Sequence, residues 1–82
     1  MRSAMSAIRE DAKRKFILKE KERIITSFAH NPNTKHRAIT KVVKRILIDG
    51  PYLLNGRMWE VKAKSLGAGV YELSLKLQGG EN

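Results

Sequence analysis

The chain has 82 residues, of which 17 are Lys or Arg and 8 are Asp or Glu, so its formal net charge is +9. It contains no Cys, which excludes disulfides, thiolate metal sites and cysteine nucleophiles. No apolar run approaches the roughly 18 residues of a membrane span, and no apolar stretch typical of a secretory signal follows the basic N-terminus. We therefore expect a single small cytoplasmic domain, residues 1–82, that does not bind membranes and whose positive field favours a polyanionic partner.

The positive charge is concentrated in the first part of the chain. Residues 1–49 carry 13 of the 17 basic residues and 5 of the 8 acidic ones. Gly50-Pro51, a strong breaker of regular structure, lies at the border between this part and the rest. The positive field therefore belongs mainly to residues 1–49, and we expect a polyanion-binding surface there.

Residues 4–31 are predicted to be helical, but they carry two apolar faces. The first face consists of Ile17, Ile24, Ile25 and Phe28, with Leu18 and Ala29 at its border. The second, roughly opposite, consists of Met5, Ile8, Ala12 and Phe16. One unbroken helix would expose one of these faces. Either residues 15–18 contain a break or a short strand, or the first turns pack against something else, such as a second copy in a homodimer.

Residues 35–49 are predicted to form a basic amphipathic helix. Its apolar stripe has the helical spacing i, i+3, i+4, i+7 and consists of Ala38, Ile39, Val42, Val43, Ile46 and Leu47. The opposite face carries only basic residues, namely Arg37, Lys41, Lys44 and Arg45. His36, next to Arg37, is expected to add to this face.

After residue 51 the apolar period changes to two, which predicts strands with one wet face. Residues 57–64 and 70–77 alternate in this way, and the glycine-containing segment 65–69 joins them as a hairpin loop. The hairpin must cover the apolar stripe of the basic helix, because an isolated hairpin is marginal in water. The predicted fold class is α+β, with N-terminal helices and a basic helix packed on a C-terminal antiparallel hairpin.

Several cations on distinct elements are candidates for binding nucleic-acid phosphates, because each neutralised phosphate adds salt-dependent affinity. The candidate nucleic-acid-binding residues are Arg37, Lys41, Lys44, Arg45, Arg57, Lys62 and Lys64. The alternative is that these residues form ordinary solvated faces. Trp59 is in register with Val61 and Ala63, which favours a place in the core over a base-stacking platform. With two His and no Cys, the sequence indicates neither a metal site nor a cofactor.

No Ser-His-Asp arrangement, carboxylate pair or metal-ligand set stands out, so whether the protein is an enzyme stays open. Any catalysis would depend on Lys, Arg, Tyr or His acting on a substrate that brings its own geometry. RNA held by a ribosome is such a substrate, since cations and general acid–base groups cleave RNA without metal. The catalytic candidates for such an endoribonuclease are Lys62, Lys64 and Tyr71.

The stretch from Lys41 to Leu75 resembles the middle of the RelE/HigB-type toxin superfamily. The likeness is carried by Val42–Leu53, a helix that ends in a Gly-Pro-x-Leu-like turn, and by Lys64–Leu73, with its Lys-x-Leu and Val-Tyr-Glu-Leu segments. The resemblance implies a small basic bacterial or phage α+β protein that acts on RNA at the ribosome and has an antitoxin-type protein partner. Ser74 stands where the family usually has Arg, and the strands that carry the family's catalytic residues are missing from this sequence. The resemblance thus covers a divergent or inactive relative as well as an active nuclease.

Two other functions fit the sequence. Helix, turn, basic helix and glycine-tipped hairpin also resemble a winged helix-turn-helix, in which residues 35–49 would enter the major groove of DNA as a non-enzymatic regulator. That arrangement requires residues 4–31 to divide into two helices. The other function is a phage-type inhibitor that binds a nucleic-acid-processing protein through its positive surface.

Overall fold

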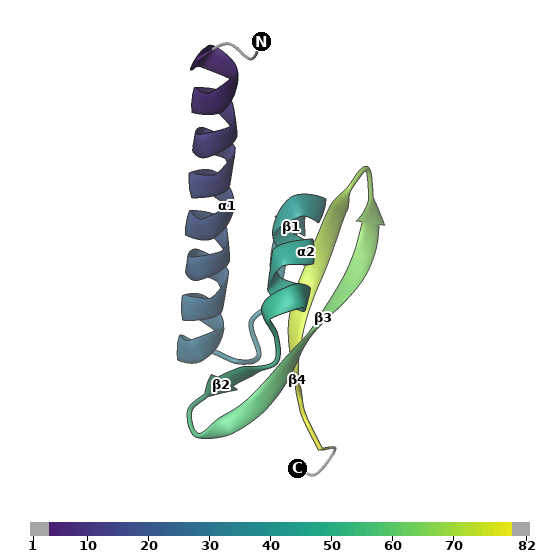
Figure 1. The fold of residues 1–82 in the computed structure, drawn as a ribbon. Helices are drawn as coiled ribbons and strands as arrows, with labels where there is room; N and C mark the ends of the chain where they lie inside the picture. Colours follow the sequence, from purple (N-terminus) through teal and green to yellow (C-terminus); the bar gives the residue numbers. More distant parts are fainter. Residues whose placement is uncertain (1–3, 80–82) are drawn as a thin grey trace.

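The computed structural model describes the backbone of residues 4–79 and the side chains of residues 8–79. Within this range the chain forms, in order, α1 (Ala4–His30), β1 (His36–Ile39), α2 (Thr40–Asp49), β2 (Tyr52–Leu54), β3 (Arg57–Gly67) and β4 (Val70–Leu77) (Figure 1). The strands make one antiparallel sheet in the order β1-β4-β3-β2. The predicted α+β class, with its strands toward the C-terminal end, is confirmed.

The core lies where α2 meets the sheet on one side and α1 on the other. From α2 come Val42, Val43 and Ile46, which are buried because they share one face of the helix. From α1 come Ile24 and Phe28, and from the sheet Ala38, Leu54, Val61 and Leu73. An ion pair between Lys21 of α1 and Asp49 at the end of α2 links the two helices. α2 therefore covers one face of the sheet, and α1 is held mainly through its last three turns.

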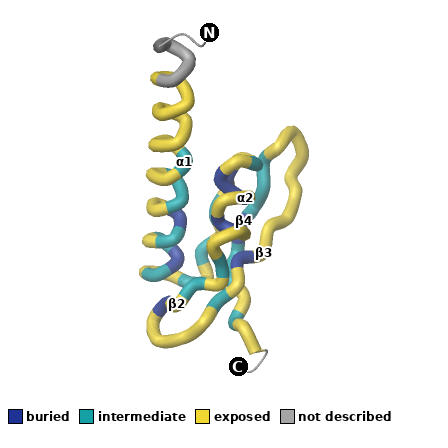
Figure 2. The backbone as a smooth tube through the Cα atoms, viewed as in Figure 1, coloured by how far each residue is buried: buried dark blue, intermediate teal, exposed yellow. Residues whose placement is uncertain are grey.

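Helix α1 is continuous through residues 15–18, so the predicted break or short strand there is wrong. Its first turns extend well past α2 (Figure 1), and residues 8–16 of this part are exposed (Figure 2). Ile8 is 67% exposed and Phe16 is 52% exposed, whereas Ile24 and Phe28 on the other face are fully buried. One continuous helix thus exposes its second apolar face. Met5, the fourth residue of that face, lies outside the described side chains.

The segment His36–Ile39 is a strand, so the prediction that the basic helix begins at residue 35 is wrong. β1 is too short for periodicity to distinguish it from a helical turn, and its pairing with the distant β4 determines its conformation. α2 begins at Thr40, whose backbone N–H and side-chain hydroxyl both donate to the carbonyl oxygen of Gly69 at 2.9 Å. The start of α2 is therefore attached to the tip of the β3–β4 hairpin.

The sequence predicts that His36 adds to the basic face, and this prediction is wrong. The His36 side chain points into the protein. Its Nε2 lies 2.8 Å from the hydroxyl of Ser27, and its ring meets Phe28 edge to face at 5.3 Å. Burial, together with the positive charge of Arg23, lowers the pKa of His36.

Two hairpins complete the sheet. The predicted β3–β4 hairpin is confirmed and is longer than expected, with a two-residue turn at Ala68 (φ +55) and Gly69 (φ +77). The β2–β3 hairpin was not predicted, and it turns at Asn55 (φ +52) and Gly56 (φ +76). Positive φ at both turn residues is the type I′ geometry that Asn-Gly favours. The Asn55 side-chain amide also donates to the carbonyl oxygen of Ala29 at 3.2 Å, which ties this turn to the end of α1.

Trp59 packs against the core, as its register with Val61 predicts. Its indole N–H donates to the carbonyl oxygen of Leu54 at 3.2 Å, so the polar atom of this half-buried ring has a partner. No helix in the described part of the chain combines the length and hydropathy needed to cross a membrane.

Candidate nucleic-acid interface

The two faces of the sheet differ in what covers them. Residues of one parity, such as Val61 and Leu73, are buried beneath α2. Residues of the other parity, such as Lys62 and Lys64, are exposed on the opposite side, which no element within residues 4–79 covers. We refer to this second side as the open face. In β1, Ala38 is buried in the core, so its neighbour Arg37 projects on the open face.

The open face is predominantly basic. Its cations, here named the open-face cations, are all exposed and consist of Lys35, Arg37, Lys62, Lys64 and Lys76. Glu60 and Glu72 are the carboxylates among the strand residues of this face. The open face therefore presents a net positive surface that the hydrophobic core does not require.

The register of the strands fixes how these charges are spaced. Arg37 of β1 lies opposite Glu72 of β4, which in turn lies opposite Lys64 of β3. Two strand spacings of about 4.8 Å separate β1 from β3, so their cations stand roughly 10 Å apart at the backbone. Along β3, Lys62 and Lys64 are two residues apart, which is about 7 Å. A surface depression of about 340 Å³ lies among them, lined by Lys35, Lys62, Ala63, Lys64, Glu72 and Ser74.

A second basic surface lies on α2. Lys41, Lys44 and Arg45 are exposed on the side of α2 opposite its buried residues, so they face away from the sheet. Ile48, 73% exposed, stands on the same side. We name Lys41, Lys44 and Arg45 the α2 cations.

The seven predicted nucleic-acid-binding residues do not form one surface. Arg37, Lys62 and Lys64 lie on the open face, whereas the α2 cations lie on the other side of the molecule. The prediction that Arg37 shares a helix face with Lys41 is wrong, because Arg37 belongs to β1. Arg57 is exposed at the start of β3 and lies apart from both groups, on the parity of Trp59.

Two open-face cations were missed by sequence reasoning. Lys76 alternates with the buried positions of its strand in the same way as Lys62, so the period of two was a sufficient signal. Lys35 precedes β1 and joins the open face only because His36–Ile39 pairs with β4. No local pattern in the sequence indicates that pairing.

The three catalytic candidates are not brought together. Tyr71 has the parity of Leu73 and packs half-buried against the core, whereas Lys62 and Lys64 project on the open face. Among residues 4–79 no three His, Asp or Glu side chains gather in a metal-binding arrangement.

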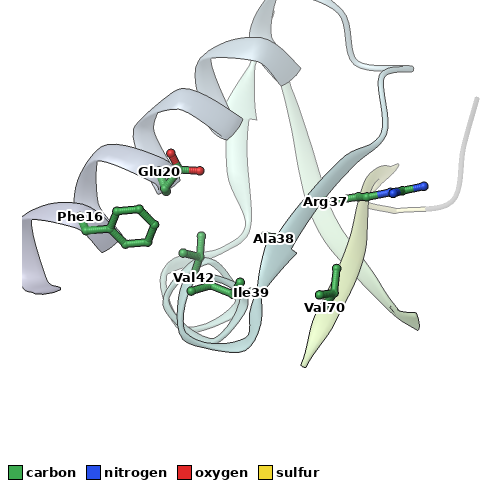
Figure 3. Close-up of a pocket in the computed structure, with 7 residues that line it drawn as sticks. All are labelled: Phe16, Glu20, Arg37, Ala38, Ile39, Val42 and Val70. Atoms are coloured by element: carbon green, nitrogen blue, oxygen red, sulfur yellow. The ribbon is translucent and has the colours of Figure 1, made fainter. Parts of the chain in front are cut away.

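An apolar groove lies between the overhanging part of α1 and the start of α2. It has a volume of about 190 Å³ and is lined mainly by Phe16, Ile39, Val42 and Val70. Figure 3 shows Phe16 pointing across the groove toward Val42, while Arg37 points away from it. Arg37 also borders the groove, so the groove adjoins the open face at β1.

Comparisons with protein-family models, with curated proteins and with solved structures found no match to this chain.

Proposed function

We propose that this protein binds nucleic acid, namely RNA that is either free or part of the ribosome. We propose further that the open face is its principal interface. The observation that supports this proposal is the gathering of the open-face cations on the side of the sheet that no helix within residues 4–79 covers. A solvated sheet face ordinarily mixes both signs of charge. Here five cations stand against two carboxylates in the described strands and their border.

The open-face cations are suited to binding phosphates because of their number, and also because no ion pair among the described residues holds them. Among the described residues, Lys15 pairs with Asp11, Lys21 with Asp49, and Arg23 with Glu20. None of them involves an open-face cation. Free cations release the condensed counterions of a nucleic acid when they bind, and each phosphate contact contributes about −0.9 to the slope of log K against log salt.

The test reverses two charges on each basic surface in turn. Lys62→Glu with Lys64→Glu changes the open face, and Lys44→Glu with Arg45→Glu makes the same change in net charge on α2. We expect the open-face pair to reduce affinity for a mixed-sequence RNA at least tenfold and to lower the salt slope by about 2, since each lysine contributes about 1. Fluorescence anisotropy at several salt concentrations measures both quantities.

The α2 pair is the matched control, and we expect it to retain most of the affinity. If the α2 pair abolishes binding and the open-face pair does not, the interface is α2, as in the winged-helix alternative. If neither pair changes binding, the proposal is wrong. Capture of a protein partner from nuclease-treated lysate, without any RNA binding, would instead favour the inhibitor alternative.

We also propose a ribosome-directed activity of the RelE/HigB type as a second candidate function. It is supported by the α+β architecture and by the position of the resembling segments. Val42–Leu53 covers α2 and the start of β2, and Lys64–Leu73 covers the β3–β4 turn, whose Gly69 is bonded to the start of α2. Induced expression in bacteria, with mapping of transcript ends, tests this function. Growth without arrest, and transcripts without ribosome-dependent cleavage, would remove it.

A further inference from the structure

The spacing of the charged and polar residues on the open face, as well as its net charge, bears on the class of nucleic acid that it binds. We propose that its ligand is double-helical RNA, bound across the minor groove, with the two columns of open-face cations on the two phosphate strands. This inference rests on the proposed function and names the class of nucleic acid. Its support is the aromatic inventory of the chain, the spacing of the cation columns, and the two polar residues between them.

The open face has no ring on which an unpaired base could stack. Phe28 is fully buried, and Tyr52, Trp59 and Tyr71 are half-buried against the core on the helix-covered side. Phe16 is exposed, but it belongs to α1 and lines the apolar groove. Proteins that bind single strands stack bases on aromatic side chains, and each stacked base adds affinity. A basic face without aromatic side chains gains no affinity from stacking. It therefore favours a nucleic acid that is recognised through its sugar-phosphate backbone.

Four of the five open-face cations stand in two columns, one on each side of β4, and the fifth, Lys76, lies on β4 itself, opposite Glu60. Lys35 and Arg37 form one column beside β4, and Lys62 and Lys64 form the other. The columns are roughly 10 Å apart at the backbone, and long side chains can widen or narrow that distance. A single strand presents one row of phosphates. A double helix presents two rows, one on each side of a groove, and so can satisfy both columns at once.

Between the columns stand Glu72 and Ser74 of β4. A carboxylate in this position repels a phosphate, so the middle of the open face is suited to a groove and not to a backbone. The wide, shallow minor groove of A-form RNA displays 2′-hydroxyl groups, which both donate and accept hydrogen bonds. The Glu72 carboxylate accepts such bonds, and the Ser74 hydroxyl accepts or donates them. DNA lacks these hydroxyls, so the pair of residues favours RNA over DNA.

The first experiment compares three ligands of one sequence and length, namely duplex RNA, duplex DNA and single-stranded RNA. Anisotropy at a fixed salt concentration should give the tightest binding for duplex RNA, with the other two at least fivefold weaker. Single-stranded RNA that binds as tightly as the duplex would overturn the inference. Equal binding of duplex RNA and duplex DNA would overturn it as well.

The second experiment changes the residues between the columns. Ser74→Ala and Glu72→Gln should each reduce the ratio of RNA to DNA affinity, at least threefold for the double variant. Glu72→Gln should also raise the affinity for DNA, because it removes a charge that repels phosphate. Glu60→Gln is the matched control on the same face, since Glu60 lies on β3 opposite Lys76 and not between the columns, and it should leave the ratio unchanged.

Thermal unfolding of each variant shows that it remains folded. An unchanged ratio in the folded double variant contradicts the role of Glu72 and Ser74. Failure of this inference differs from failure of the proposed function, in which no nucleic acid is bound or reversal of Lys62 and Lys64 has no effect.

Discussion

Among single residues, His36 is one whose pKa changes when the protein folds. It is held between the Ser27 hydroxyl and the edge of the Phe28 ring. Burial, and then the positive charge of Arg23, lowers the pKa of His36 below its ordinary value of about 6.5. The neutral imidazole is therefore favoured in the folded protein, while the unfolded chain takes up a proton more readily.

This difference makes stability depend on pH. When the pH falls through about 6.5, the unfolded chain binds the proton first, so the free energy of unfolding decreases until His36 is also protonated in the folded protein. We expect the Tm to fall between pH 7.5 and pH 5.5, measured by circular dichroism. His36→Gln should flatten this dependence, whereas His30→Gln, at an exposed position of the same helix–strand connection, should leave it in place. A Tm that rises on acidification over this range would contradict the assignment.

Among the elements, α1 has two parts that differ in their contribution to stability. Ile24 is fully buried between α1 and α2, and Ile8 is 67% exposed on the overhanging part of the same helix. Ile24→Ala should destabilise the protein by about 2–5 kcal/mol, because the removed atoms leave a cavity in the core. Ile8→Ala should change stability by less than about 0.5 kcal/mol, as is usual for surface substitutions.

Chemical denaturation with urea measures both changes in the free energy of unfolding. Similar losses for the two variants would mean that the overhanging turns of α1 are packed in solution, as they would be in the homodimer that the sequence suggests. In that case the loss for Ile8→Ala should also depend on protein concentration.

The elements also show which parts of the fold are encoded locally. The alternation in β3 and β4 is periodic over enough residues to be recognised, and that prediction holds. The predicted apolar stripe holds only in part, because Val42, Val43 and Ile46 of α2 are buried whereas Ile39 and Leu47 are exposed. Asn55-Gly56 was a local hairpin signal that was overlooked. β1 could not be predicted, because four residues fit a helical turn equally well and only the pairing with β4 decides. That one pairing also decides whether Arg37 lies with the α2 cations or on the open face.

For the whole molecule, the net charge of +9 divides between opposite sides. The α2 cations face away from the sheet, and the open-face cations lie on its other side, so one flat ligand cannot contact both groups. The overhanging part of α1 adds Arg9, Lys13, Arg14 and Lys15, all exposed, of which Lys15 is paired with Asp11. Self-repulsion within each surface destabilises the compact state, and a polyanion relieves it on one surface at a time.

This repulsion predicts opposite effects of salt on the free protein and on its complex. Raising the ionic strength from 0.01 M to 0.15 M shortens the Debye length from about 30 Å to about 8 Å, which is less than the separation of the two cation columns. The Tm of the free protein should therefore rise by a few degrees. Duplex RNA at 100 times its Kd adds about 2.7 kcal/mol of stability, and this addition should shrink as salt weakens binding. Thermal scans with and without duplex RNA should thus converge as salt increases. In the Lys62→Glu, Lys64→Glu variant, at the same RNA concentration, the difference between the two scans should be at most about half as large. A free-protein Tm that falls with salt would show that attraction outweighs repulsion among these charges.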